Sequence, residues 1–251
     1  MKTYSSKRLP AILAFGLFLY AGMLQAEDEF LTEEDLYGDD ISSGPVISDP
    51  LEPVNRSIFK FNDFALLKIV QPVADGYEAV TPDPVEEGAS NFFYNLKYPV
   101  RLAGNLLQGR LKGAGVETGR FVINTGFSLG FMTPADDIEM LQPIASEDVG
   151  QALGSWGIAE GPYLVLPFFG PSNLRDLGGL IGDRAVNPMQ EPFSLIDDWN
   201  WEWRLALAAT EYTVDSPSIV DRYLQLKGSA IDPYSSLKNG YTQFRRAAIE
   251  E

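Results

Sequence analysis

The 251-residue chain contains no cysteine and no histidine. Without cysteine it has no disulfide framework and no thiol nucleophile. Histidine is the usual general base near neutral pH and the commonest metal ligand, so its absence argues against Ser–His catalysis and against a transition-metal site. The commonest routes to enzymatic chemistry are therefore missing.

Basic residues are also scarce, because 19 Lys and Arg stand against 35 Asp and Glu, for a net charge of −16. The first 26 residues hold three of the positive charges, so the remainder carries −16 − 3 = −19. A nucleic-acid partner demands Lys and Arg for its phosphates, and we predict none. Any membrane contact must depend on local apolar surface, since anionic headgroups would be repelled.

The N-terminal region differs in composition from the rest of the chain. A short basic region precedes an apolar stretch, Leu9–Gly22, and small Ala26 stands at the expected cleavage site, which predicts a signal peptide at residues 1–26. An uncleaved N-terminal anchor is the alternative. Residues 27–48 are acidic and poor in large apolar side chains, as in a flexible linker. We expect the folded domain to span residues 49–251.

Within this domain the apolar pattern has a helical period, and no series of alternating strands is present. The pattern predicts helices over residues 54–70, 83–98, 99–107, 112–131, 147–156, 199–212, 217–228 and 233–249. The first should be buried on more than one side, and the third should turn Leu102, Leu106 and Leu107 inward. The predicted fold class is mainly α.

The apolar segment Gly161–Pro171 differs from the helices because it contains three prolines, at 162, 167 and 171. Proline at this spacing excludes a helix, and Pro167 excludes a paired central strand. We therefore predict an extended hydrophobic loop or a hairpin. It is either a mobile element or an ordinary buried crossing.

Paired carboxylates occur at Asp136-Asp137, Glu147-Asp148 and Asp197-Asp198. A glycosidase needs two acids on opposite walls of a cleft, whereas these are sequence neighbours. We interpret them as helix caps and first-turn acids. We likewise interpret Arg175-Asp176 as a structural ion pair. The sequence predicts no catalytic residue, no metal and no cofactor.

Several motifs occur in the order found in one known family: Asp49-Pro-Leu-Glu-Pro-Val-Asn55-Arg56, Phe59-Lys-Phe61-Asn62, Asn91-Phe-Phe-Tyr-Asn95-Leu96, Asn105-Leu-Leu-Gln108-Gly109, Arg120-Phe121-Val-Ile-Asn124-Thr125, Glu147-Asp148-Val-Gly150-Gln151, Gly161-Pro162-Tyr163, Leu166-Pro167, Gly170-Pro171-Ser172, Arg175-Asp176 and Asp232-Pro233-Tyr234. Together they resemble the MlaA/VacJ family over Asp49 to Phe244. The signature candidates are Asn55, Arg56, Phe59, Asn62, Arg175 and Asp176. The Asn55-Arg56 pair is either a lipid contact or a lock at the helix start.

The resemblance implies a compact, ring-like helical domain at the periplasmic face of the outer membrane. It implies removal of outer-leaflet phospholipid through a central amphipathic channel, with a trimeric porin and a soluble, MlaC-like periplasmic carrier as partners. It also places a flexible loop that influences the channel at the Pro/Gly-rich segment. The channel or gating candidates are Gly157, Gly161, Pro162, Tyr163, Leu164, Val165, Pro167, Phe168, Phe169 and Gly170.

Many members of the family are lipoproteins anchored through an N-terminal cysteine. Here Leu19-Tyr20-Ala21-Gly22 resembles the run before such a cysteine, but Met23 follows it. We therefore expect no lipidation, and attachment through the helices and the porin. A non-transporting adaptor that docks a porin or carrier is the alternative function.

Overall fold

The computed structural model describes residues 47–190, 194, 196 and 198–250. The predicted signal peptide, and all but the last two residues of the predicted linker, lie outside the described residues.

The described chain is mainly helical, as predicted. Its first half contains α3 (Glu52–Ala65), a π-helical turn η1 (Leu66–Val70), α4 (Gln71–Val80), α5 (Asp83–Leu96), α6 (Tyr98–Leu107) and α7 (Leu111–Ser128). Two 3₁₀ turns follow, η2 (Pro134–Asp137) and η3 (Glu139–Leu141). The second half contains α8 (Val149–Ser155), β1 (Tyr163–Leu166), β2 (Gly170–Asn173), α9 (Leu174–Val186), α10 (Trp201–Ser229) and α11 (Pro233–Glu250). The two strands pair antiparallel, so the proline-rich segment forms a hairpin, one of the two predicted forms.

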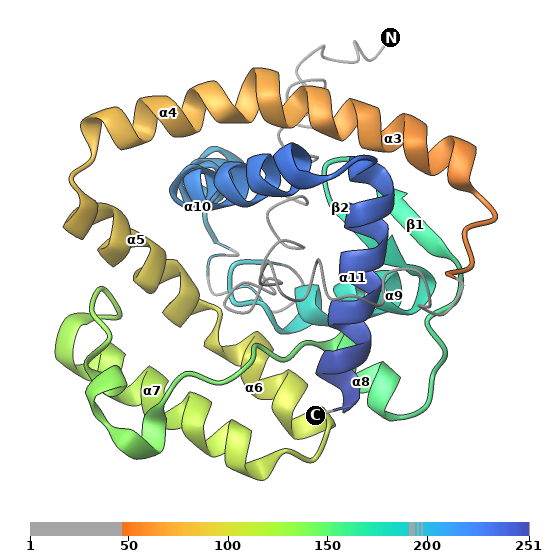
Figure 1. Ribbon diagram of the computed structural model, residues 1–251. Coiled ribbons are helices and arrows are strands. Elements are labelled where there is room, and N and C mark those ends of the chain that lie inside the picture. Colours follow the sequence, from red (N-terminus) through yellow and green to blue (C-terminus); the bar gives the residue numbers. More distant parts are fainter. Residues whose placement is uncertain (1–46, 191–193, 195, 197, 251) are drawn as a thin grey trace, which may run out of the picture.

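The elements are arranged as a ring, which confirms the predicted fold class (Figure 1). The helix α4 packs on α10, α10 on α5, and α5 on α6. The circuit continues because α6 packs on α8, α8 on α9, and α9 on β2. It closes where β1 packs against α3, which leads back to α4 through η1. Helix α11 joins α8, α10 and β2.

The helix predicted over residues 54–70 continues to Val80. Its α-helical pattern opens into a π-turn at Leu66–Val70, where the N–H of Gln71 bonds to the carbonyl of Leu66, five residues back. Proline at position 72 stands in the first turn of α4, where its missing N–H does least damage. The π-turn therefore carries the helix past Val70, the predicted end of the helix.

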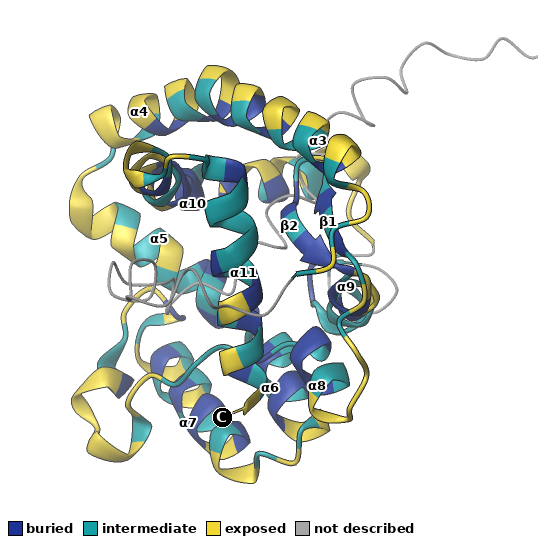
Figure 2. Cartoon of the chain, turned by 45° about the vertical axis from the view of Figure 1, so that its right-hand side comes forward, coloured by how far each residue is buried: buried dark blue, intermediate teal, exposed yellow. Residues whose placement is uncertain are grey.

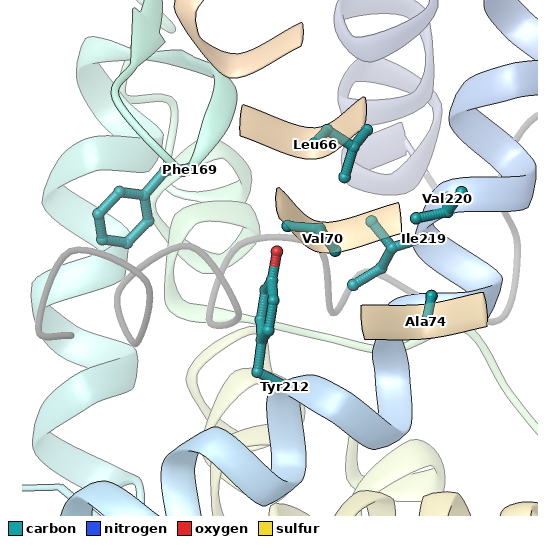
Figure 3. Packing of buried hydrophobic residues seen from close by; sticks show 7 residues of the cluster. All are labelled: Leu66, Val70, Ala74, Phe169, Tyr212, Ile219 and Val220. Carbon is teal, nitrogen blue, oxygen red and sulfur yellow. The ribbon is translucent and has the colours of Figure 1, made fainter. Parts of the chain in front are cut away.

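One side of this long element packs on α10 and on the hairpin. Figure 3 shows Leu66, Val70 and Ala74 facing Ile219 and Val220 of α10. Phe169 and Tyr212 complete the same cluster. The opposite side is exposed (Figure 2). Phe61 and Phe64 are 45% and 60% exposed, so the expectation that this helix is buried on more than one side was wrong.

Helix α10 runs through Pro217, which we expected to separate two helices. Proline cannot donate the hydrogen bond that the carbonyl of Thr213 would accept four residues earlier. The hydroxyl of Ser216 donates to that carbonyl instead, at 2.8 Å. A buried serine thus satisfies the backbone group that proline leaves without a partner.

Helix α6 buries the side opposite to the one that we predicted. Leu106 and Leu107 are 50% and 40% exposed, and they do not point inward. Arg101, Gly104 and Asn105 are buried instead. The helix buries its polar side and presents leucine to the outside.

Candidate functional site

The hairpin turns at Pro167, between Leu166 and Gly170, which face each other in the ladder. Proline is tolerated there because it lies outside both strands. The predicted glycines 157, 161 and 170 have φ of 84°, 70° and 78°, conformations that glycine adopts without penalty. Phe168 also has a positive φ, 67°, which is unfavourable by roughly 1–2 kcal/mol for a residue with a Cβ.

Two asparagines of α3 clamp β1. Asn55 donates to the carbonyl of Tyr163 at 3.0 Å and accepts from the N–H of Val165 at 2.9 Å. Asn62 donates to the carbonyl of Leu166 at 2.9 Å and accepts from the N–H of Phe168 at 2.8 Å. Each side-chain amide thus imitates a neighbouring strand.

The spacing of the two asparagines matches the strand. Seven residues of α-helix rise about 10.5 Å. The carbonyls of Tyr163 and Leu166 lie three residues apart in the extended strand β1, and three extended residues span about 10 Å. Asn55 and Asn62 therefore meet successive groups of a strand that runs along the helix. Asn55 is 2% exposed and bonds to β1, an arrangement that agrees with the second of our two interpretations, a lock at the helix start.

The other signature residues of α3 join the hairpin base to α11. Arg56 bonds to Glu52 and to Asp232, and its guanidinium lies 4.3 Å from the ring centre of Tyr234. The hydrogen bond from Arg56 lowers the pKa of Asp232 to about 2. The ring of Phe59 contacts that of Tyr234 edge-on, with centroids 5.8 Å apart.

Within the hairpin, side chains alternate between the core and the surface. Tyr163 and Val165 are buried with Tyr234, whereas Leu164 is half-buried. Phe169 is buried on α10, and Phe168 is half-buried against Phe61. Pro162 is half-buried, and Pro167 is exposed at the turn. The structure thus gathers the predicted loop residues from Tyr163 to Gly170 into one hairpin, whereas Gly157 lies outside it, directly after the end of α8.

Arg175 and Asp176 form the predicted ion pair, with 2.9 Å between Nε and Oδ1. Asp176 also accepts from Arg245 of α11 at 2.9 Å and from the hydroxyl of Tyr241 at 2.6 Å. Burial alone would raise the pKa of Asp176, but Arg245 and these hydrogen bonds outweigh it and hold the pKa below its ordinary value. This pair is structural and lies where α8, α9 and α11 meet.

Sequence reasoning missed the centre of that junction, Arg245, which also binds both carboxylate oxygens of Asp148. Asp148 caps α8 through the N–H of Gln151, as we interpreted it. Nothing local in the sequence marks Arg245, because its partners lie 69 and 97 residues away.

A second feature is an apolar outer face on α6 and α7. Leu111 and Val122 lie on one side of α7, about three helical turns apart. Within residues 90–135, all of which are described, Lys112 is the only exposed charged residue. Trp156, 56% exposed, borders this face and donates its indole N–H to the carbonyl of Leu107 at 2.9 Å. The exposed large apolar side chains of the face are Leu106, Leu107, Leu111, Val122, Phe127, Leu129, Phe131 and Met132.

Beneath this face the charges are buried and paired. Arg101 bonds to Glu117 at 2.8 Å, and its guanidinium lies 3.7 Å from the ring centre of Tyr94. Arg110 pairs with buried Glu147. Charged residues are almost never fully buried unless they are paired, and here the pairs replace an apolar interior. This segment is polar inside and apolar outside.

No helix in the described part of the chain combines the length and apolarity needed to cross a bilayer. The described residues also contain no group of three or more acidic side chains suited to a metal ion.

Two serines precede a lysine by three residues, but their hydroxyls are otherwise engaged. Ser57 donates to the carbonyl of Pro53 at 2.8 Å, and Ser235 donates to Asp232 at 2.6 Å. Neither hydroxyl is arranged as a nucleophile beside a lysine base.

Comparison with known proteins agrees with this architecture. A sequence model described as MlaA lipoprotein matches residues 47–248. An intermembrane phospholipid transport system lipoprotein MlaA of Haemophilus influenzae is 32% identical over 201 residues, which are 78% of this chain and 77% of that protein. The protein of the same name from Escherichia coli K12 is 33% identical, over 78% and 76% of the two chains. A solved structure described as the structural basis for maintenance of bacterial outer membrane lipid asymmetry is similar with a TM-score of 0.65 and 28% identity, over 80% of this chain and 99% of that one.

Proposed function

The chain belongs to the MlaA lipoprotein family, and from this premise we propose that it moves phospholipid between the outer membrane and a soluble periplasmic carrier. In this function it removes phospholipid from the outer leaflet and so maintains the lipid asymmetry of the membrane. The names of its relatives support the phospholipid substrate.

The observation that carries the proposal is the apolar outer face on α6 and α7. A water-exposed protein surface carries charged side chains, whereas this one displays leucine, valine and phenylalanine above buried ion pairs. Such a surface suits immersion in lipid, where apolar side chains face acyl chains and polar groups pair inside. Trp156 at its border fits the headgroup region, where tryptophan is enriched.

On this proposal the protein sits at the periplasmic face of the outer membrane, beside a trimeric porin. Phospholipid passes through a central amphipathic channel to an MlaC-like carrier, and the hairpin regulates the passage. Attachment does not need an acyl chain, because the face on α6 and α7 supplies apolar contact. The proposed role needs no catalytic residue, and in agreement with it Asp148 caps α8 and Asp176 pairs with Arg175.

Membrane immersion is tested by placing a charge on the apolar face. Val122 is 59% exposed on that face, so a glutamate at this position would place a charged carboxylate in the lipid and oppose immersion of the face. A charged side chain held in a bilayer is unfavourable by about 2.5–3.5 kcal/mol at its centre. We expect Val122→Glu to lower flotation of the purified mature protein with phosphatidylethanolamine–phosphatidylglycerol vesicles by at least about tenfold.

The matched control is Val80→Glu, at the end of α4. Val80 is 80% exposed and has exposed acids close by in sequence, at Glu78 and Asp83. A further acid should leave flotation unchanged. Equal losses in the two variants would reflect net charge, and unchanged flotation of Val122→Glu would remove the membrane face from the proposal.

Transport itself is tested in cells that lack the protein. A membrane-impermeant amine reagent should label more phosphatidylethanolamine at their surface, and the wild-type gene should reverse this. Restoration by a variant that docks the porin but carries no phospholipid on mass spectrometry would favour the adaptor function.

A further inference from the structure

Three of the four tryptophans in the chain stand together at the start of α10. Trp199, Trp201 and Trp203, which we name the tryptophan cluster, are 48%, 59% and 67% exposed. All six residues from Asp198 to Trp203 are exposed, so this end of α10 projects from the packed part of the ring. Tryptophan is highly buried on average in proteins that water surrounds, and a group of exposed large apolar side chains marks an interaction surface.

The chemistry of the tryptophan cluster points to the boundary between lipid headgroups and acyl chains. An indole has an apolar body and a polar N–H, and tryptophan is enriched at this boundary for that reason. The charged residues within the segment are the exposed acids Asp198 and Glu202, and residues 198–203 include no basic side chain. Attraction to anionic headgroups therefore does not hold this segment at a membrane, and burial of the indoles has to do so.

The cluster is connected to one end of the apolar outer face on α6 and α7. Phe131, at the end of that face, stacks on Phe92 of α5 with ring centroids 4.9 Å apart. Phe92 and Ile196 pack against the same group of buried hydrophobic residues. The N–H of Trp199 then bonds to the carbonyl of Ile196 at 3.0 Å. A series of direct contacts thus joins the tryptophan cluster to the face.

The other end of the face carries the fourth tryptophan. Trp156 bonds to the carbonyl of Leu107, just before α7 begins, whereas Phe131 lies just beyond the end of α7. Helix α7 has 18 residues and is therefore about 27 Å long. Figure 1 shows α8, which Trp156 follows, and α10 at separate places around the ring. The face therefore has exposed indoles at both of its ends.

We propose that Trp199, Trp201 and Trp203 form a second membrane anchor, with their indoles at the headgroup–acyl boundary of a phospholipid bilayer. This rests on the proposed function, in which the face on α6 and α7 is immersed in lipid. Indoles at both ends of the face fix the orientation of the ring against the membrane, because a body held at a single point can tilt. The acids beside the cluster make a zwitterionic lipid surface its preferred partner.

Depth-dependent fluorescence quenching tests the anchor on the mature protein. Because the chain has four tryptophans, Trp156→Phe leaves the cluster as the reporter. The triple change Trp199→Phe, Trp201→Phe and Trp203→Phe leaves Trp156 as the reporter and keeps an aromatic ring at each position. The probes are phosphatidylcholine vesicles brominated near the carboxyl end or near the methyl end of the acyl chain. We expect bromines near the carboxyl end to lower the fluorescence of the cluster at least about twofold, and bromines near the methyl end to lower it less.

The two reporters separate the anchor from the proposed function. If the cluster is not quenched while Trp156 is, the anchor is wrong and the membrane face on α6 and α7 stands. Stronger quenching of the cluster by bromines near the methyl end would place the indoles among the acyl chains and would also overturn the anchor. If neither reporter is quenched, the immersion in the proposed function fails as well. An unquenched cluster whose emission shifts to the blue with rising protein concentration would refute the anchor and assign the surface to a second copy of the chain.

Flotation gives an independent test. Serine at positions 199, 201 and 203 removes the indoles from exposed sites, and we expect at least about fivefold less of this variant to float with phosphatidylcholine vesicles. Ile231→Ser is the matched control, because Ile231 is a fully exposed apolar residue beyond the other end of α10. It should leave flotation unchanged. Equal losses in the two variants, or no loss in the serine variant, would contradict the anchor; if the serine variant does not fold, the quenching of the cluster in Trp156→Phe decides.

Discussion

Replacing Arg245 with methionine tests whether the junction of α8, α9 and α11 depends on buried charge. Arg245 is 4% exposed and pairs with Asp148 and Asp176, at 2.5 and 2.9 Å. Methionine keeps much of the length and apolar volume but leaves both carboxylates without their cation. Removing one partner of a buried ion pair costs about 3–5 kcal/mol. For a domain of this size we expect the melting temperature to fall by roughly 6–20 °C.

Arg246 is the matched control, because it follows Arg245 directly and also forms an ion pair. Its partner Glu160 lies 2.5 Å away, but the two side chains are 34% and 26% exposed. A pair that water can reach contributes about 0–1 kcal/mol. Arg246→Met should therefore lower the free energy of unfolding by at most about 1 kcal/mol. Denaturant unfolding in a mild non-ionic detergent, followed by circular dichroism at pH 7.5, compares the two.

The pH dependence gives an independent check. In the wild type the pKa of Asp176 is below its ordinary value, so the stability from Asp176 is present above the unfolded pKa and is lost only as pH falls through the folded one. Without Arg245, we expect burial to outweigh the remaining hydrogen bonds from Arg175 and Tyr241 and to raise the pKa of Asp176, so that the folded state binds more protons than the unfolded one. The difference in the free energy of unfolding between wild type and Arg245→Met should therefore become smaller as the pH falls from 7.5 to 5.5. A deficit that grows on acidification, or one within about 1 kcal/mol of Arg246→Met, would refute the reasoning.

Two further predictions concern the same junction. A Cβ on Gly179 would lie 2.4 Å from the Cα of Gly150, so Gly179→Ala should be strongly destabilising. A Cβ on Gly178 would meet its nearest atom at 4.0 Å, so Gly178→Ala should raise the free energy of unfolding by a few tenths to about 1 kcal/mol. Equal shifts of the melting temperature in the two variants would contradict close helix approach. Burial and the neighbouring Asp148 raise the pKa of Asp183 to about 8, so wild-type stability should decline as pH rises from about 4 to 8. Asp183→Asn removes this titration and should be more stable than wild type at pH 8, with the difference vanishing toward pH 4; parallel profiles would count against it.

The helices and the hairpin could be predicted because their signals are local. Proline and glycine spacing restricted residues 161–171 to a loop or hairpin, and the helical period located most helix cores. Two predicted helix ends, near Pro72 and at Pro217, were wrong because local hydrogen bonding accommodates each proline, which the apolar pattern does not show. A π-turn precedes Pro72, and the hydroxyl of Ser216 satisfies the carbonyl left open by Pro217.

The direction in which side chains face could not be predicted in the same way. We placed Leu106 and Leu107 inward by the rule that apolar residues avoid water, and the structure exposes both. That rule assumes water on the outside. The signal for the opposite arrangement was present in α6, where Arg101 and Asn105 recur at a spacing of four and mark a polar side that the fold buries. The contacts of Asn55 and Asn62 could not be predicted either, since their partners in the hairpin lie more than 100 residues away in the sequence.

An apolar outer face changes what can specify the packing of α6, α7 and α8. If lipid surrounds these helices, burying a leucine between them gains little over leaving it outside. Polar pairs and close backbone contact must then fix the arrangement. A Cβ on Gly104 would lie 2.5 Å from the carbonyl carbon of Glu147, so glycine is what lets α6 approach the segment before α8. At that approach the carboxylate of Glu147 accepts hydrogen bonds from Gln108 and Arg110, both in the turn between α6 and α7. The glycine sets the distance and the buried carboxylate sets the register, which are the two quantities that apolar burial cannot supply in a membrane.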